Sequence, residues 1–261
     1  MDLTLDGRHA LVCGASEGIG RAAAHELALL GADVTVLARR AEVLEEVAGA
    51  LPRKDGQQHA WIAADMARPE PLQAKVQALV SGRPVTILVN NTGGPPGGAA
   101  HTAPVAEFDE AFRRHLVANQ LLLQAVLPGM RAAAWGRVVN VVSTSVREPI
   151  PGLGVSNTVR AAVAGWAKTL SRELAPFGIT VNNVLPGFTD TGRIERLVQA
   201  RAESTGRPQA EIAEGMRQAV PAGRFARPEE VGGVIAFLCS PAAGYVNGVS
   251  LAVDGGRMHS I

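Results

Sequence analysis

Short apolar runs alternate with amphipathic stretches along most of the chain, and this alternation predicts the secondary structure. The runs last five or six residues and are rich in Val, Leu and Ile, which is typical of strands buried on both faces of a parallel sheet. The intervening stretches repeat apolar residues at helical spacing and are long enough to cross back over the sheet. We predict strands over 9–13, 33–37, 59–63, 85–89, 137–142, 180–185 and 249–253, and helices over 18–30, 41–51, 71–80, 108–130, 156–174 and 228–238.

This order of elements indicates repeated βαβ crossovers. The fold class that follows is α/β, a doubly wound parallel sheet of about seven strands with helices on both faces. No linker or internal repeat divides the chain, so we expect a single domain over 1–261.

One segment is longer than an ordinary connection. Residues 189–223 separate the sixth predicted strand from the last predicted helix and carry only a weak apolar stripe at Ile194, Leu197 and Val198. An insertion at the carboxyl end of a parallel sheet is a typical place for a substrate lid. The alternative is a solvated helical excursion without a role in the site.

Composition and charge exclude several classes of partner. The chain has 261 residues, of which 47% are hydrophobic, and a formal net charge of +1, so no general field attracts nucleic acid or an anionic membrane. Its two cysteines, Cys13 and Cys239, lie in apolar runs without metal-ligand or redox spacing, and we expect them to be reduced and buried. The first residues show no signal-peptide pattern, and no apolar stretch is long enough to span a membrane. We therefore expect a cytoplasmic protein without a metal site.

The strongest chemical signal follows the first predicted strand, where residues 14–20 read Gly-Ala-Ser-Glu-Gly-Ile-Gly and lead directly into a helix. Glycines let the backbone turn tightly and approach a pyrophosphate, whose charge meets free N–H groups at the helix N-terminus. Taken alone, such a turn is weak evidence, because many strand-to-helix turns use glycine. The residues that we expect to form a dinucleotide site here are Gly14, Ser16, Glu17, Gly18, Ile19 and Gly20.

Later segments carry further motifs, and together with the Gly-x-x-x-Gly-x-Gly spacing they resemble the short-chain dehydrogenase/reductase family over residues 5–256. Within that family, residues 221–231 are most similar to the 3-oxoacyl-[acyl-carrier-protein] reductase branch. The resemblance implies a Rossmann-type fold, a nicotinamide cofactor, a small-molecule carbonyl or alcohol substrate, and a homotetramer or a dimer. The motifs are Asn90-Asn91-Thr92-Gly93 after the fourth strand, Asp65 after the third, Pro186-Gly187 with Thr189 and Thr191, Tyr245-Val246-Asn247-Gly248, and Asp254-Gly255-Gly256. By the same resemblance, Asp65 contacts the adenine, and Asn91, Gly93, Pro186, Gly187, Thr189 and Thr191 line the cofactor site.

The end of the second strand favours NADP(H) over NAD(H). A cofactor with a free ribose 2′-hydroxyl needs a carboxylate there, but the strand ends in Arg39 and Arg40. An arginine suits a 2′-phosphate through its charge and its paired N–H groups. Glu17 argues against this choice, because a carboxylate near the phosphate repels it. An ordinary solvated arginine pair at the start of a helix is the other interpretation.

The catalytic positions of the resemblance are altered. Ser143 matches the family's catalytic serine, but Ser156 stands where the family has its tyrosine, and Arg160 stands where it has its lysine. Residues four apart share a helix face, so Ser156 and Arg160 can still point into one cleft. His115 stands where the family usually has an asparagine, and Asn119 follows one turn later.

These changes matter because reduction of a ketone produces an alkoxide that must receive a proton. A tyrosine tuned by a nearby cation is an effective acid, whereas a serine hydroxyl is a much weaker one. Arginine keeps its own proton, although Arg160 can supply charge and hold the nicotinamide ribose. His115, or His101 in the loop after Asn91, can relay a proton if its pKa is near neutrality. Alternatively, the reaction needs no strong acid.

Three functions remain open. The first is an NADP(H)-dependent oxidoreductase acting on a carbonyl or alcohol, possible substrates including a 3-oxoacyl thioester. The second is a catalytically impaired cofactor-binding homologue that acts as a sensor or an inactive subunit. The third is a non-redox lyase, epimerase or hydrolase on the same scaffold, although no second acid/base pair stands out in the sequence.

Overall fold

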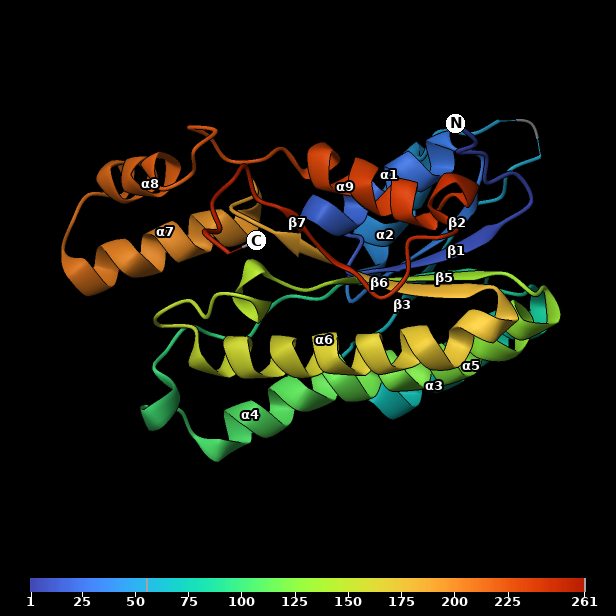
Figure 1. Cartoon of the computed structure of the whole chain (residues 1–261), viewed down its shortest axis with the longest axis horizontal. Helices are drawn as coiled ribbons and strands as arrows, with labels where there is room; N and C mark the ends of the chain where they lie inside the picture. Colours follow the sequence, from blue (N-terminus) through green and yellow to red (C-terminus); the bar gives the residue numbers. More distant parts are fainter. Residues whose placement is uncertain (55, 261) are drawn as a thin grey trace.

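A computed structural model, which describes residues 1–54 and 56–260, contains one parallel sheet whose strands follow the order β3-β2-β1-β4-β5-β6-β7 (Figure 1). The strand order changes direction between β1 and β4. In doubly wound folds, ligands bind at this switch point, outside the carboxyl ends of the strands. Seven parallel strands confirm the predicted fold class. Their bounds are β1 His9–Cys13, β2 Asp33–Ala38, β3 Ala60–Ala63, β4 Ile87–Asn90, β5 Gly136–Val141, β6 Ile179–Pro186 and β7 Ser250–Val253.

Helices cover both faces of the sheet (Figure 1). On β1, Ala10 and Val12 pack into a core shared with α1, α2 and α9, while Leu11 and Cys13 pack into a second core shared with α3, α5 and α6. Each strand is therefore buried on both sides, which explains its continuous apolar sequence. The helices are α1 Gly18–Leu29, α2 Ala41–Ala50, α3 Pro69–Gly82, α4 Val105–Phe112, α5 Ala118–Ala132, α6 Gly154–Leu174, α7 Gly192–Thr205, α8 Gln209–Gln218 and α9 Pro228–Cys239.

Short helical turns complete the connections. Four of them are 3-10 turns: η1 Ala100–Thr102, η3 Thr144–Val146, η4 Ala175–Phe177 and η5 Pro241–Ala243. Most predicted boundaries differ from the observed ones by one or two residues. The helix predicted over 71–80 is longer at both ends, since a proline is well accepted in the first turn of α3.

The helix predicted over 108–130 is interrupted. Between α4 and α5 the chain forms a π-helical turn, η2 Arg113–Val117, which packs against α6. A π-turn inserts one residue into the helical repeat and rotates the side chains that follow it, and such turns are frequent at functional sites. His115 lies in this turn.

The predicted insertion 189–223 contains α7 and α8, which lie beyond the carboxyl ends of the strands (Figure 1). The two helices form a small core of their own from Ile194, Val198, Ile212 and Met216. A bridge between Thr189 and Ala226 ties the base of the insertion to the segment before α9. The apolar stripe therefore serves to pair these helices. Within the described residues, no helix is long and apolar enough to cross a membrane.

Candidate active site

A cleft of about 650 Å³ opens at the carboxyl edge of the sheet, between the loops after β1 to β4 and the start of α7. Five of the residues predicted for a cofactor do not lie in its wall: Gly20 and Arg160 are buried behind it, and Pro186, Gly187 and Thr189 lie beyond it. The predicted residues that do line it are Gly14, Ser16, Glu17, Gly18, Ile19, Arg39, Arg40, Asp65, Asn91, Gly93 and Thr191.

The turn after β1 requires glycine for two physical reasons. Gly14 and Gly18 have φ of 60° and 56°, in the left-handed region that side chains rarely adopt. A Cβ at Gly20 would lie 2.3 Å from the Gly14 carbonyl oxygen, so the helix packs directly on the turn. Asn91 holds the turn from the next strand, because its Nδ2 donates to the carbonyls of Cys13 (3.3 Å) and Gly14 (3.2 Å).

The charges at the end of β2 are arranged differently from what the sequence suggested. The Glu17 carboxylate forms an ion pair with Arg40 at 3.4 Å and lies 3.7 Å from the guanidinium of Arg196 of α7. Its negative charge is therefore balanced by two guanidinium groups. Arg39 is exposed and, within the described residues, has no carboxylate partner.

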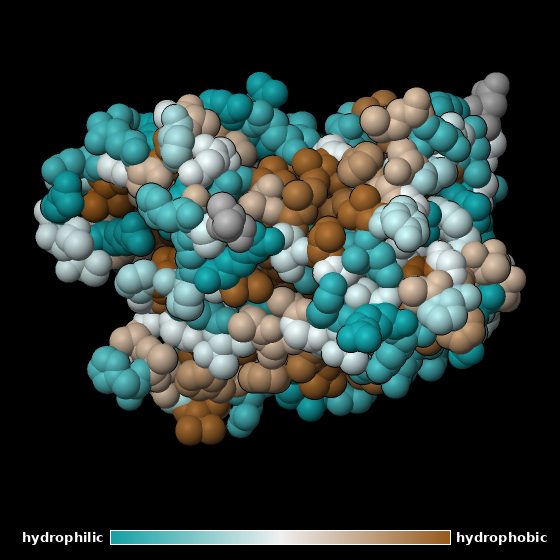
Figure 2. All heavy atoms as spheres, viewed as in Figure 1, coloured by the Kyte–Doolittle hydropathy of each residue, from teal (hydrophilic) through white to brown (hydrophobic). Residues whose placement is uncertain are grey.

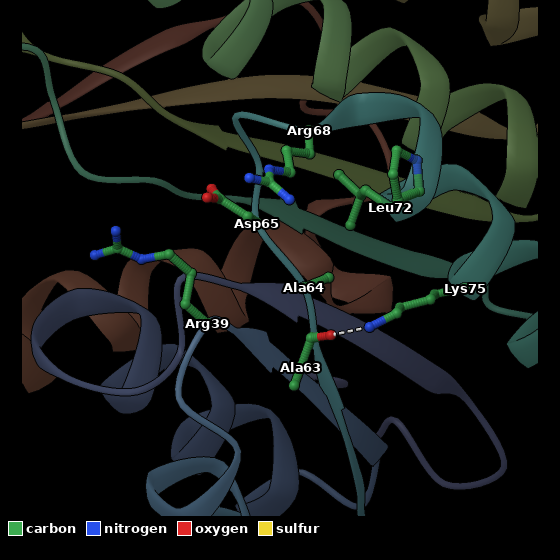
Figure 3. A pocket seen from close by; sticks show the side chains of 8 residues that line it. Arg39, Ala63, Ala64, Asp65, Arg68, Leu72 and Lys75 are labelled. Carbon is green, nitrogen blue, oxygen red and sulfur yellow. Dashed lines mark hydrogen bonds between the residues drawn. The ribbon is translucent and has the colours of Figure 1, made fainter.

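A smaller cavity of about 360 Å³ adjoins this end of the cleft (Figure 3). In Figure 3 the Arg68 guanidinium lies beside Asp65, whereas that of Arg39 is turned away from it, and the Lys75 Nζ donates to the Ala63 carbonyl at 2.5 Å. Sequence patterns did not single out Arg68 or Lys75, because they lie on a different βα unit from Arg39. Their side chains make this end of the cleft basic.

The predicted catalytic elements do come together. Ser143 follows β5, and its Oγ accepts from the Ser145 amide at 3.1 Å. The first two turns of α6 carry Ser156 and Arg160, which are only 6% and 8% exposed, and α6 packs against η3 just after Ser143. Ser156 and Arg160 are therefore both buried on α6, and neither they nor Ser143 and His115 are among the residues that line the cleft.

Arg160 is a buried cation, and within the described residues its hydrogen bonds go to carbonyl oxygens alone. Its Nη1 donates to Val141 at 2.8 Å and its Nη2 to Thr92 at 3.3 Å, and within residues 1–54 and 56–260 no carboxylate pairs with it. Burial, followed by the charge of Arg193, lowers the pKa of Arg160 to about 10. The guanidinium is still protonated at neutral pH.

The structure corrects the expectation that His115 has a near-neutral pKa. His115 is 2% exposed in η2, and within the described part of the chain its Nε2 has no hydrogen-bond partner. Burial first, and then the charges of Arg160, Arg114 and Arg193, lower the pKa of His115 to about 2. The imidazole is therefore neutral near pH 7 and cannot act there as a charged acid, as a near-neutral pKa would have allowed.

Other candidates lie away from the cleft. His101 is exposed in η1 and does not form part of the cleft wall. Asn119 is buried in α5 one turn after His115, and Tyr245 is fully exposed in the loop before β7. Three arginines that sequence reasoning missed, Arg114, Arg193 and Arg196, do line the cleft. They come from η2 and α7, which only the tertiary fold brings to the site.

Comparisons with known proteins agree with this architecture. A family model described as "Enoyl-(Acyl carrier protein) reductase" matches residues 14–258. The 3-oxoacyl-[acyl-carrier-protein] reductase FabG of Aquifex aeolicus is 32% identical over 98% of this chain and 99% of its own, and a cyclohexanol dehydrogenase of a Rhodococcus species is 34% identical over 99% of each chain.

Solved structures match over nearly the whole length. An L-sorbose reductase from Gluconobacter frateurii, in complex with NADPH and L-sorbose, superposes with a TM-score of 0.93 at 30% identity, covering 100% of both chains. YwfH, an NADPH-dependent reductase involved in bacilysin biosynthesis, superposes with a TM-score of 0.91 at 27% identity, covering 97% of this chain and 99% of its own. The chain belongs to the short-chain dehydrogenase/reductase family of oxidoreductases and resembles its 3-oxoacyl-[acyl-carrier-protein] reductase branch.

Proposed function

We propose that this protein is an NADP(H)-dependent oxidoreductase that transfers a hydride between nicotinamide and a small carbonyl or alcohol substrate. The observation that carries the proposal is the cleft itself. A glycine turn that leaves no room for a Cβ at Gly20 meets the N-terminus of α1, and Arg39, which pairs with no carboxylate of the described residues, stands at the end of β2. This arrangement fits a dinucleotide with a phosphate on its ribose.

The choice of NADP(H) rests on how the charges pair. Because Arg40 and Arg196 neutralise Glu17, the carboxylate in the glycine turn does not prevent a 2′-phosphate from binding beside Arg39. Arg68 and Lys75 add positive charge nearby (Figure 3). The sorbose reductase and YwfH, which use NADPH, support the same choice. Asp65 would face the adenine, and Asn91 and Gly93 the middle of the dinucleotide.

In the proposed mechanism the cofactor, when bound, supplies or accepts the hydride. The hydroxyls of Ser143 and Ser156 bind the substrate oxygen, and Arg160 stabilises the negative charge that develops there. A serine hydroxyl is a weak acid. Ser156 can therefore donate a proton to the substrate oxygen only if water returns a proton to Ser156 at once. Neutral His115 orients this network by hydrogen bonding and does not change its charge.

The insertion 189–223 acts as the lid in this proposal. Arg193, in the first turn of α7, reaches across the cleft and donates to the Gly94 carbonyl at 3.4 Å. The same loop is fixed on its other side, since the Gly98 amide donates to Gly152 at 2.7 Å. A closed lid excludes water from a site that lacks a strong acid.

A catalytically impaired homologue is the second candidate, and Ser156 in place of the tyrosine is the observation that favours it. Such a protein would bind the cofactor as a sensor or an inactive subunit. Its cleft would look the same, so only turnover separates the two candidates.

The test begins with fluorescence titration of purified protein by NADPH and NADH. We expect NADPH to bind more tightly, and we expect NADPH-dependent turnover of at least one substrate among ketoacyl thioesters, oxo acids, sugars and quinones. The Ser156→Tyr, Arg160→Lys double variant is the discriminating control. Turnover that appears only in this variant would establish the impaired homologue, and failure to bind either cofactor would refute both candidates.

Assembly and location are part of the proposal. Hydrophobic side chains gather over α9 and β7 on the face shown in Figure 2, where Val249 and Leu251 are 37% and 39% exposed. This apolar surface supports a homotetramer or a dimer, which light scattering after size exclusion measures directly. The buried, unpaired Cys13 and Cys239 support a cytoplasmic location.

A further inference from the structure

The far end of the cleft from Arg39 holds positive charge that no carboxylate of the described chain balances. Arg160 is buried and does not line the cleft, whereas Arg193 of α7 is exposed in the cleft wall. Neither forms an ion pair within residues 1–54 and 56–260, whereas the neighbouring Arg114 and Arg196 pair with Glu110 and Glu17. A buried, unpaired cation is unfavourable by several kcal/mol, so this arrangement favours a bound anion.

One loop contacts both arginines, neither of which pairs with a carboxylate of the described residues. Arg160 donates to the carbonyl of Thr92, and Arg193 donates to the carbonyl of Gly94. A Cβ at Gly94 would lie 2.8 Å from the Arg193 Nη2, so the absence of a side chain there lets the guanidinium lie against the backbone. Both cations therefore contact one short segment of chain, residues 92–94.

His115 adds an unsatisfied polar atom to the same place. Its Nε2 is buried and unpartnered within the described residues, and both Arg160 and Arg193 are close enough to influence its protonation. A guanidinium has five N–H donors, and Arg160 uses only two of its nitrogens on carbonyl oxygens. The remaining donors and the imidazole form an incomplete hydrogen-bonding site beside Ser143 and Ser156.

We propose that Arg160, Arg193 and His115 bind a carboxylate of the substrate, so that the protein acts on free oxo acids or hydroxy acids and not on neutral ketones or thioesters. The inference rests on the proposed oxidoreductase function and specifies its substrate class. A carboxylate accepts paired hydrogen bonds from guanidinium groups, and this geometry orients the neighbouring carbonyl carbon.

The reaction then balances as follows. In the direction of reduction, the hydride of NADPH forms the new C–H bond at the carbonyl carbon, and the electron pair of the broken C=O π bond moves to oxygen. That oxygen takes one proton from water, directly or through Ser156, to give the hydroxy acid and NADP⁺. The carboxylate is unchanged throughout and serves only for binding.

The competing source of negative charge is the cofactor, whose phosphates also attract arginine. Position separates the two sources. Arg39 and Arg40 lie at the end of β2, whereas Arg160 is bound to Val141, the last residue of β5, next to Ser143. Arg193 lines the cleft and donates to Gly94 in the loop after β4, so its role decides the question.

The test uses oxamate and oxamide, which are nearly equal in shape and differ by a carboxylate in place of an amide. Calorimetric titration of the wild type, both free and saturated with NADP⁺, compares their affinities. The variants are Arg193→Gln and Arg160→Gln, with Arg193→Lys as the charge-conserving change. Arg201→Gln on the exposed face of α7, outside the cleft wall, is the matched control, and circular dichroism verifies that each variant is folded.

We expect oxamate to bind the NADP⁺-saturated wild type at least about tenfold more tightly than oxamide, as for charge-assisted hydrogen bonds. Arg193→Gln should abolish this preference and change the Kd of NADP⁺ by less than about threefold, while Arg193→Lys and Arg201→Gln retain the preference.

Three results would overturn the inference. One is equal binding of oxamate and oxamide, or binding of neither. Another is an unchanged preference in Arg193→Gln, and a third is a loss of NADP⁺ affinity in that variant of about tenfold or more, which would assign the arginine to a cofactor phosphate. If the wild type does not bind NADP⁺ at all, the proposed function fails, whereas the titration of the free protein still decides whether the anion site exists.

Discussion

Replacing Gly20 by alanine tests how the cofactor turn is built. The added methyl carbon would lie 2.3 Å from the Gly14 carbonyl oxygen and 2.7 Å from the Asn91 Nδ2. Favourable separations for such atoms are about 3.5 Å, so the turn must move by roughly 1 Å. That movement strains the hydrogen bonds from Asn91 to Cys13 and Gly14, which join the turn to the next strand.

The expected loss follows from these contacts. Overpacking of this kind destabilises a protein by about 1–3 kcal/mol, and each weakened hydrogen bond adds about 1 kcal/mol. The better helix propensity of alanine offsets about 1 kcal/mol. We expect Gly20→Ala to lower the free energy of unfolding by about 2–4 kcal/mol, which for a chain of this size lowers Tm by roughly 4–16 °C. Urea denaturation and thermal scans measure both quantities.

Two other glycines provide controls. Gly93 is exposed in the cleft wall with open space where a Cβ would be, so Gly93→Ala should change stability by less than about 0.5 kcal/mol. It should nevertheless weaken NADPH binding about tenfold, because a methyl group blocks close approach of the cofactor to the backbone. Gly49→Ala, in the open on α2, should stabilise the fold by about 0.5–1 kcal/mol without affecting NADPH. A wild-type Tm for Gly20→Ala, or an equal Tm loss for Gly93→Ala, would refute this reasoning.

Three further predictions address selectivity, pH and packing. Arg39→Ala should raise the Kd of NADPH by about 10–100-fold and leave that of NADH unchanged in fluorescence titrations, and an equal loss for both cofactors would contradict it. His115 has a native pKa of about 2, below its unfolded value of about 6.5, so it contributes stability that is lost as pH falls below 6.5. We therefore expect the free energy of unfolding, measured by urea denaturation from pH 7 to 5, to fall less steeply for His115→Asn than for the wild type, by up to about 1.4 kcal/mol per pH unit. Parallel plots of unfolding free energy against pH would contradict this prediction. Gly232→Ala places a Cβ 2.9 Å from the Ala22 carbonyl carbon where α9 crosses α1, and it should cost about 1–3 kcal/mol; an unchanged Tm would show that the helices can separate.

The sequence predicted the sheet well because each strand carries its own evidence. Residues such as Ala10 and Leu11 face opposite cores, and burial on both sides makes the whole strand apolar. The glycine turn could also be predicted from the sequence, because its backbone angles and close contacts require glycine at fixed spacing. Helical periodicity also led us to expect Ser156 and Arg160 on one face of a helix, and both are buried in the first two turns of α6.

The rest depended on contacts between distant segments. The π-turn η2 has no signature in local periodicity, yet it determines where His115 points. The pKa of His115 depends first on its burial and then on Arg160, Arg114 and Arg193, two of which lie on other helices. The sequence could not show that the negative charge of Glu17 is balanced near the expected 2′-phosphate site. Arg196, which helps to balance it, lies some 180 positions later in the chain and reaches the same cleft only in the folded protein.

Among the described residues, Arg160 supplies a cation, and neither the serine hydroxyls nor His115 is a strong acid near pH 7, which limits the chemistry of the proposed site. Arg160 remains protonated with a pKa of about 10, and His115 remains neutral with a pKa of about 2, so neither changes charge near pH 7. Only solvent or a hydroxyl relay can then deliver the proton. A buried guanidinium that no carboxylate of the described residues balances is unfavourable, and a negative charge on the ligand relieves that cost. An oxyanion would do so only while the reaction proceeds, whereas a substrate carboxylate does so on binding. The preference between oxamate and oxamide separates these two cases, because only the second stabilises a ligand that never reacts.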